Sequence, residues 1–143
     1  MLKFLHSSWA FLVLLMFILT LSIYFSGYAK NKLFDFRTDF RIASFTFIVL
    51  SIQIILGLLT WFSSPYFAGL KQGHMPEYMH NAHERLLVVE HPLMMIIAWV
   101  LTLIGFLRLK KITASRKKYA SIILWYGLAF LLILSRIPWS NWL

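Results

Sequence analysis

The stretch Arg85–Gly105, RLLVVEHPLMMIIAWVLTLIG, decides the fold class of this chain. Read at helical spacing, it carries one stripe of mostly small or polar residues, namely His91, Met95, Ala98, Thr102 and Gly105. Nearly all the other residues are large and apolar. A helix in water hides an apolar stripe, whereas here apolar residues surround a polar one. This pattern indicates a helix in lipid whose polar stripe faces other protein.

The dipeptide His91-Pro92 interrupts this apolar run. An ionisable ring inside a membrane helix is costly, so His91 is a candidate functional residue. Pro92 has no N–H and disfavours α geometry at the residue before it. We therefore expect the helix either to kink at His91 or to begin there, with the ring turned toward the bundle interior.

The composition places the chain among integral membrane proteins. Of its 143 residues, 60% are hydrophobic and 13% are charged, and the mean hydropathy is +0.74. A soluble domain would be about 45–50% apolar and about 25% charged. The net charge of +9 would suggest nucleic acid in a soluble chain. Here the basic residues flank apolar runs, so we expect topology signals beside anionic lipid and no nucleic-acid partner.

Four apolar runs, at about 4–27, 42–62, 85–107 and 119–137, each approach or exceed the roughly 20 residues that cross a bilayer. We predict an all-α fold, a single transmembrane domain over residues 1–143 that forms a four-helix antiparallel bundle with an outer loop at 63–84. Proline and glycine interrupt this loop, so any helix in it should be short. Gln53, near the middle of the second run, should form an interhelical hydrogen bond.

The basic residues predict the orientation of the bundle. Ten of the fourteen Lys and Arg lie in the two links that join the first run to the second and the third to the fourth. The positive-inside rule then places both links in the cytoplasm. The N-terminus, the C-terminus and the loop 63–84 are expected on the outer, periplasmic side of a bacterial inner membrane. All five histidines then lie toward that side.

His6 and His91 are the candidate cofactor ligands. The first and third runs have the same direction, so these two imidazoles should lie at similar depth, which suits axial ligation of a haem. The chain has no cysteine, so the haem would be non-covalently bound haem b. Further residues complete the predicted site: Ala10 and Ala98 leave room for the macrocycle, Arg85 and Arg136 neutralise its propionates, and Glu90 accepts the second ring N–H of a histidine.

Three segments carry a family resemblance: Leu5-His6-Ser7 with the aromatic-rich helix after it, Val89–Met95 (VEHPLMM), and Arg136-Ile137-Pro138-Trp139. Through these segments the chain resembles small bacterial four-helix cytochrome b-like integral membrane proteins, and the resemblance covers essentially the whole chain. These proteins are distantly similar to copper-resistance D and ferric-reductase-like transmembrane cytochromes. The resemblance implies non-covalent haem b held by His6 and His91. The chain differs from the two-haem members, which have histidine pairs near both faces.

Other functions stay open from the sequence. The loop 63–84 holds His74, His80 and His83 with Met75 and Met79, a ligand mixture that suits copper, and His83 is an alternative haem ligand. A cofactor-free accessory subunit of a larger membrane complex is another alternative. An electron-transfer protein is favoured over a stand-alone enzyme, because no nucleophile–base pair or phosphate loop is present. Expected partners are the lipid bilayer, a quinone or a periplasmic redox protein, and a homo-oligomer or larger membrane complex.

Overall fold

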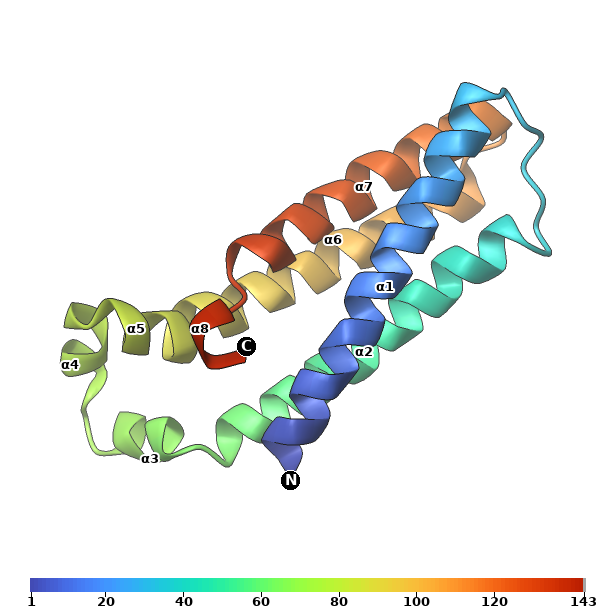
Figure 1. The fold of residues 1–143 in the computed structure, drawn as a ribbon. Coiled ribbons are helices and arrows are strands. Elements are labelled where there is room, and N and C mark those ends of the chain that lie inside the picture. Colours follow the sequence, from blue (N-terminus) through green and yellow to red (C-terminus); the bar gives the residue numbers. More distant parts are fainter. Residues whose placement is uncertain (143) are drawn as a thin grey trace.

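The computed structural model describes residues 1–142, and these residues form helices and connecting segments without strands (Figure 1). Four helical segments are long and apolar enough to cross a membrane: α1 (Leu2–Ala29), α2 (Asp39–Phe62), the stretch Ala82–Lys111, and α7 (Ser115–Ser135). The third comprises α5 (Ala82–Arg85), a π-helical turn η1 (Leu86–Glu90) and α6 (His91–Lys111). The predicted all-α fold with four membrane-length helices is confirmed.

Each long helix of the bundle packs against two others. α1 contacts α2 and α7, and α6 likewise contacts α2 and α7, so α1 and α6 lie across a diagonal of the bundle. The chain reverses direction at every link, and both of its ends lie at the same end of the bundle (Figure 1). α1 and α6 therefore run in the same direction, which places residues near their starts at similar depth.

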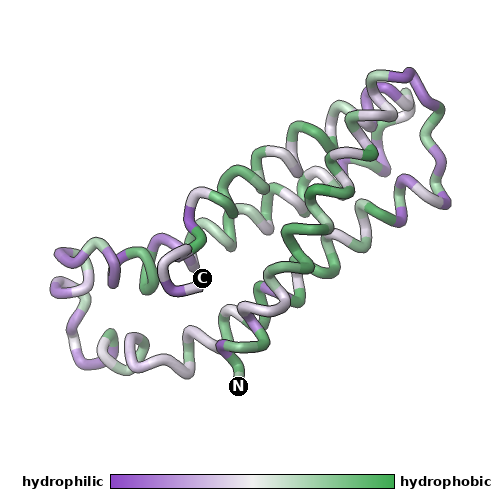
Figure 2. Tube along the Cα trace, in the orientation of Figure 1, coloured by the Kyte–Doolittle hydropathy of each residue, from purple (hydrophilic) through white to green (hydrophobic). Residues whose placement is uncertain are grey.

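Small and polar residues of the long helices face the bundle interior, as predicted for the stripe of α6. On α6, Ala98, Thr102 and Gly105 are buried. Between α1 and α2, the buried hydroxyls of Thr20 and Thr46 lie 2.6 Å apart. Apolar residues cover the outside of the helices along their length, and the hydrophilic residues gather at the two ends (Figure 2). This distribution is typical of helices whose outer surface contacts lipid.

The hydrogen-bond pattern of the third segment changes at His91: α6 begins there, as one of the two expected outcomes, directly after the π turn η1. Non-α geometry at His91 was the expectation, and it is wrong: His91 has φ −63° and ψ −53°. Its N–H donates to Leu86 O, five residues back, so one π turn precedes the proline. Pro92 has no N–H for Val88 O, and the Trp61 Nε1–H of α2 donates to that carbonyl at 3.1 Å. The helix therefore continues through His91 without an orphaned carbonyl at Val88.

Several helix limits differ from the predicted ones. The third segment starts at Ala82 rather than 85 and reaches Lys111 rather than 107, and α7 starts at Ser115 rather than 119. α7 ends at Ser135 rather than 137, because Pro138 disfavours α geometry at the residue before it. Between α2 and the third segment lie only the short helices α3 (Pro65–Lys71) and α4 (Met75–His80), as expected, and α8 (Trp139–Trp142) follows α7.

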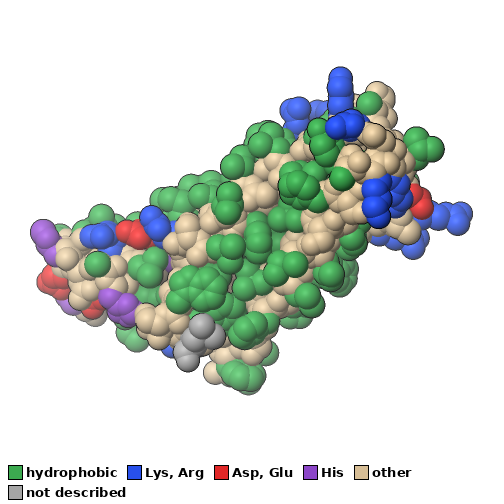
Figure 3. Space-filling model, turned by 45° about the horizontal axis from the view of Figure 1, so that its top comes forward, with side chains coloured by type: hydrophobic (Ala, Val, Ile, Leu, Met, Phe, Trp, Pro, Cys, Tyr) green, Lys and Arg blue, Asp and Glu red, His purple; other side chains and the backbone are tan. Residues whose placement is uncertain are grey.

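A buried carboxylate fastens the link between α1 and α2, and the sequence analysis did not identify it. Asp39 is 2% exposed, and its Oδ2 accepts hydrogen bonds from the Tyr119 hydroxyl of α7 at 2.8 Å and from the Asp35 N–H at 2.9 Å. The Tyr24 hydroxyl donates to the Asp39 main-chain oxygen at 2.7 Å. The start of α2 is thereby tied to α1 and α7 at the end of the bundle where Lys and Arg gather (Figure 3).

Candidate functional site

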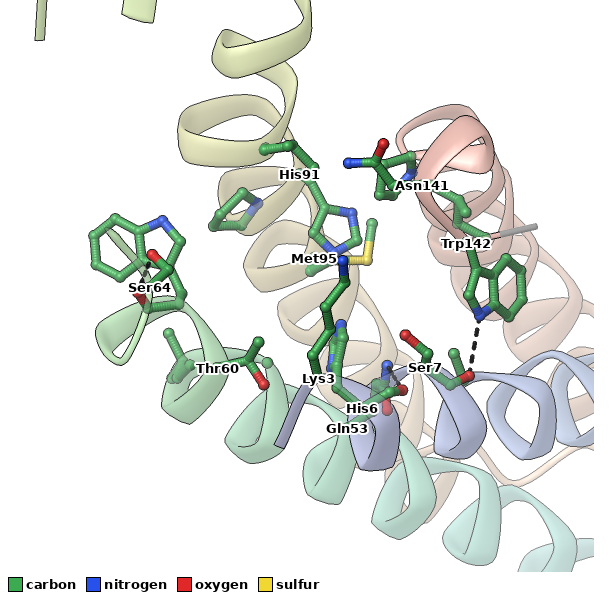
Figure 4. Close-up of a pocket in the computed structure, with 18 of the residues that line it drawn as sticks. Lys3, His6, Ser7, Gln53, Thr60, Ser64, His91, Met95, Asn141 and Trp142 are labelled. Carbon is green, nitrogen blue, oxygen red and sulfur yellow. Dashed lines mark hydrogen bonds between the residues drawn. The ribbon is translucent and has the colours of Figure 1, made fainter. Parts of the chain in front are cut away.

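A cavity of about 380 Å³ lies at the end of the bundle where α1 and α6 begin (Figure 4). This volume is within the range of about 300–1,000 Å³ that small-molecule and cofactor sites occupy. Three of the four membrane-length segments line it, together with the chain after α7. The lining includes Lys3, His6, Ser7 and Ala10 of α1, Gln53, Gly57, Thr60 and Trp61 of α2, His91, Pro92 and Met95 of α6, and Ile137, Asn141 and Trp142.

The two predicted ligands, His6 and His91, face each other in this cavity. Their ring centroids are 6.2 Å apart and their planes make an angle of 84°. A metal–imidazole bond is about 2 Å in zinc sites, so two such bonds separate the ligating nitrogens by about 4 Å and the ring centres by somewhat more. The observed ring separation is compatible with a metal ion between the two rings. Because α1 and α6 face each other across a diagonal of the bundle, the position between the two rings lies in the bundle interior.

The orientation of the His91 ring is fixed by a main-chain oxygen. His91 Nδ1 lies 2.7 Å from Arg136 O, just after the end of α7. A carbonyl oxygen can only accept, so Nδ1 carries the proton and Nε2 keeps its lone pair. This is the hydrogen bond that usually orients a metal-ligating histidine. The expectation that Glu90 would accept this ring N–H is wrong, because the chain reversal at Arg136 brings its carbonyl to His91.

The His6 ring is packed against a glycine of α2. A Cβ at Gly57 would lie 3.0 Å from His6 Cε1 and 3.4 Å from Nδ1, so only glycine leaves this ring its full space. Gln53 Nε2 donates to the His6 main-chain oxygen at 3.1 Å, which confirms the predicted interhelical hydrogen bond. His6 Nδ1 is buried and has no hydrogen-bond partner among residues 1–142. A buried polar atom without a partner is expected chiefly where a bound group or water completes the site.

The carboxylate of Glu90 binds both arginines that were predicted to neutralise a cofactor's propionates. Arg85 Nε donates to Glu90 Oε1 at 2.8 Å, and Arg136 Nε is 3.4 Å from Glu90 Oε2. None of the three lines the cavity. This cluster carries a net charge of +1 beside His91, and it joins the segment before α6 to the end of α7.

Lys3 is the charged residue that the sequence analysis overlooked. It lines the cavity three residues before His6, on the same face of α1, and no Asp or Glu lines that cavity within the described chain. The cavity therefore favours a ligand with an anionic group near Lys3. The spacing of three residues between the lysine and the histidine was the available signal.

The remaining predicted residues divide between the cavity and its surroundings. Ala10 lines the cavity, whereas Ala98 is buried in the apolar core below it. His83 lies outside, exposed, with Nε2 at 3.4 Å from Asn141 Nδ2. Over residues 1–142, no three His, Asp or Glu side chains gather closely enough to hold a metal ion, and this includes the loop 63–84.

Comparisons with protein-family models, with curated proteins and with solved structures find no match for this chain. Its function is therefore argued from the cavity itself. The imidazoles of His6 and His91 face each other there, and Nε2 of His91 is available as a metal ligand. A single lysine, Lys3, supplies positive charge to the lining of the cavity. Such a site can bind a flat, mostly apolar metal complex that carries anionic groups at one edge.

Proposed function

We propose that this protein binds one haem b through His6 and His91 and acts in electron transfer. The observation that carries the proposal is the pair of imidazoles facing each other in a mostly apolar cavity, with ring centroids 6.2 Å apart. When bound, haem b supplies a one-electron iron couple. A haem held by both His6 and His91 would have no free ligand position for oxygen, which would favour electron transfer over oxygen chemistry.

The chain's own residues hold the two ligands in place. The Arg136 carbonyl keeps His91 in the tautomer whose Nε2 is free, and Gly57 leaves space for the His6 ring. Trp142 of α8 donates from Nε1 to Ser7 O at 3.1 Å, so the C-terminal segment covers the cavity on one side and restricts the access of water. Low water access strengthens the electrostatic interactions within such a site.

Positive charge at the cavity mouth would neutralise the haem propionates. Lys3 is the cation that lines the cavity, and the Arg85–Glu90–Arg136 cluster adds a net charge of +1 outside the cavity lining, beside His91. This assignment changes the predicted roles: Lys3 would be the cation for the propionates, the side chains of Arg85 and Arg136 pair with Glu90, and the main-chain oxygen of Arg136 orients His91.

The setting of this site follows from the distribution of basic residues. We place the end of the bundle with ten Lys and Arg in the cytoplasm, and the cavity on the periplasmic side of a bacterial inner membrane. The electron partners in this proposal are a membrane quinone or a periplasmic redox protein. Membership of the cytochrome b-like family that the sequence resembles belongs to the same proposal.

Optical spectra of the full-length protein test the assignment. Purified in mild detergent after expression with added haem precursor, it should be red and show the sharp, reducible spectrum of low-spin haem b. His6→Ala and His91→Ala should each lose the haem or convert it to a high-spin form. Lys3→Gln should retain a low-spin spectrum but release haem more readily, because only a propionate contact is lost.

The double variant His80→Ala with His83→Ala is the matched control. It removes two exposed histidines from the outer loop and should leave the spectrum unchanged. A colourless protein, or unchanged low-spin spectra in both single-histidine variants, would refute the proposal. Loss of the haem in the control instead would make His83 an axial ligand. Copper found by elemental analysis in a colourless protein would favour the loop metal site.

A further inference from the structure

A second hollow, of about 330 Å³, lies at the opposite end of the bundle, where α6 ends and α7 begins. Its polar lining residues are Arg108, Lys117 and Ser121, and its apolar walls include Ile112, Leu124 and Trp125. No residue of this hollow belongs to the histidine cavity. An inference about it therefore does not depend on the proposed haem.

Two cations in this hollow lack a carboxylate partner. The ion pairs within residues 1–142 involve Asp39, Glu77 and Glu90, and none of these acids reaches Arg108 or Lys117. The Arg108 guanidinium lies 6.0 Å from the centre of the Trp125 ring, which holds it beside the hollow. The hollow therefore has two positive charges available for an anion.

The hydroxyl of Ser121 is also available. Its Oγ is buried and has no hydrogen-bond partner among residues 1–142. Several helical hydroxyls of this chain, those of Ser44, Ser51, Thr60 and Thr102, donate to the carbonyl four residues back at 2.8–2.9 Å. The buried Ser121 hydroxyl makes no such bond, and Ser121 lines the same hollow as the two cations. A hydroxyl beside two cations is a suitable donor to a phosphate oxygen.

An exposed leucine face continues from the hollow along α7. Lys117, Ser121, Leu124, Leu128 and Leu131 follow one another at steps of four and three residues, so they share one face of the helix. The three leucines are 55%, 44% and 64% exposed. From Ser121 to Leu131 the helix rises about 15 Å, which is half of a hydrocarbon core of about 30 Å. The leucine face therefore has the depth of one leaflet.

We propose that this hollow is a binding site for one anionic phospholipid. Arg108, Lys117 and the Ser121 hydroxyl bind its phosphate, and an acyl chain lies along the leucine face of α7. Arg108 and Lys117 have no nearby acid, so they favour a headgroup with net negative charge. A headgroup whose ammonium group cancels the charge of its phosphate is favoured less. The apolar walls and the adjoining leucines favour a lipid over free phosphate.

Native mass spectrometry of the full-length protein tests this site. The protein is reconstituted in nanodiscs of equal parts phosphatidylglycerol and phosphatidylcholine, and the lipids that stay bound after release are counted. Phosphatidylglycerol should be enriched. Arg108→Gln with Lys117→Gln should lower its ratio to phosphatidylcholine by about tenfold or more, since each cation near a membrane surface contributes severalfold to anionic lipid binding.

Two further variants separate this site from general surface charge. Lys30→Gln with Arg37→Gln removes the same charge from exposed positions at the same end of the bundle, and it should preserve the ratio. Ser121→Ala should lower the ratio while leaving thermal unfolding in pure phosphatidylcholine unchanged, because its hydroxyl bonds nothing without the lipid. If the charge variants fail to fold, Ser121→Ala alone decides.

Three outcomes would overturn the proposal. An equal loss in both charge variants would assign the enrichment to diffuse electrostatic attraction. An unchanged ratio in Ser121→Ala would contradict a phosphate bound by the two cations and the buried hydroxyl together. Finally, inorganic phosphate that raises the unfolding temperature in pure phosphatidylcholine, without enrichment of phosphatidylglycerol, would identify a free-anion site instead of a lipid site.

Discussion

Replacing Asp39 by alanine should cost more stability than any other single change at the basic end of the bundle. The side chain is 2% exposed and accepts two hydrogen bonds, from Tyr119 at 2.8 Å and from the Asp35 N–H at 2.9 Å. A hydrogen bond to a charged group contributes about 1.5–3 kcal/mol, so losing both should cost about 3–6 kcal/mol. Lys32, 3.5 Å away and half exposed, adds little because solvent screens that pair.

Equilibrium unfolding in mixed micelles, followed by helicity as the denaturing detergent increases, measures this cost. Tyr119→Phe should lose about 1.5–3 kcal/mol, and in the double variant the two losses should not add, because both remove the same bond. Asp35→Ala is the control: this aspartate lies in the same link but is exposed. An Asp39→Ala cost below about 1 kcal/mol, or additive losses, would refute the assigned network.

Two further predictions concern contacts between helices. Gly105→Leu should lower the yield of monodisperse protein much more than Gly127→Leu, because a Cβ at Gly105 would lie 2.7 Å from a side-chain carbon of α7, whereas one at Gly127 meets nothing within 4 Å. Trp61→Phe should cost about 1–3 kcal/mol in the same unfolding assay, because Val88 O loses its indole donor; Trp139→Phe, at an exposed tryptophan, should cost far less, and equal costs would contradict this account.

The helices and the histidine pair could be predicted because they depend on local patterns. Apolar runs define the membrane segments, and the alternating direction of the runs places His6 and His91 at one depth. Both features follow from the order of residues and from the physics of the bilayer. The interior stripes could be predicted for the same reason, since a polar residue in a membrane helix is far less costly when it faces protein.

The remaining features depend on atoms that come together only in the folded chain. The carbonyl that orients His91 belongs to Arg136, 45 residues further along, and a main-chain oxygen leaves no trace in a sequence pattern. Trp61 reaches Val88 O across 27 residues, so a rule about proline alone could not foresee that the helix continues. In the sequence, Asp39 is one polar residue of a basic link, and its burial depends on Tyr119, which lies 80 residues further along and donates a hydrogen bond to it.

The placement of polar groups limits how electrons could move through the proposed cytochrome. Both imidazoles lie near one end of the bundle, and the middle is closed by buried groups such as Phe17, the Thr20–Thr46 pair and Tyr126. At the other end, Asp39 and its partners fasten a link and offer no second pair of imidazoles. A single haem at the histidine cavity would therefore exchange electrons at one membrane face. Transfer across the bilayer would need a second redox centre in a partner, which is why a diffusing membrane quinone belongs to the proposal.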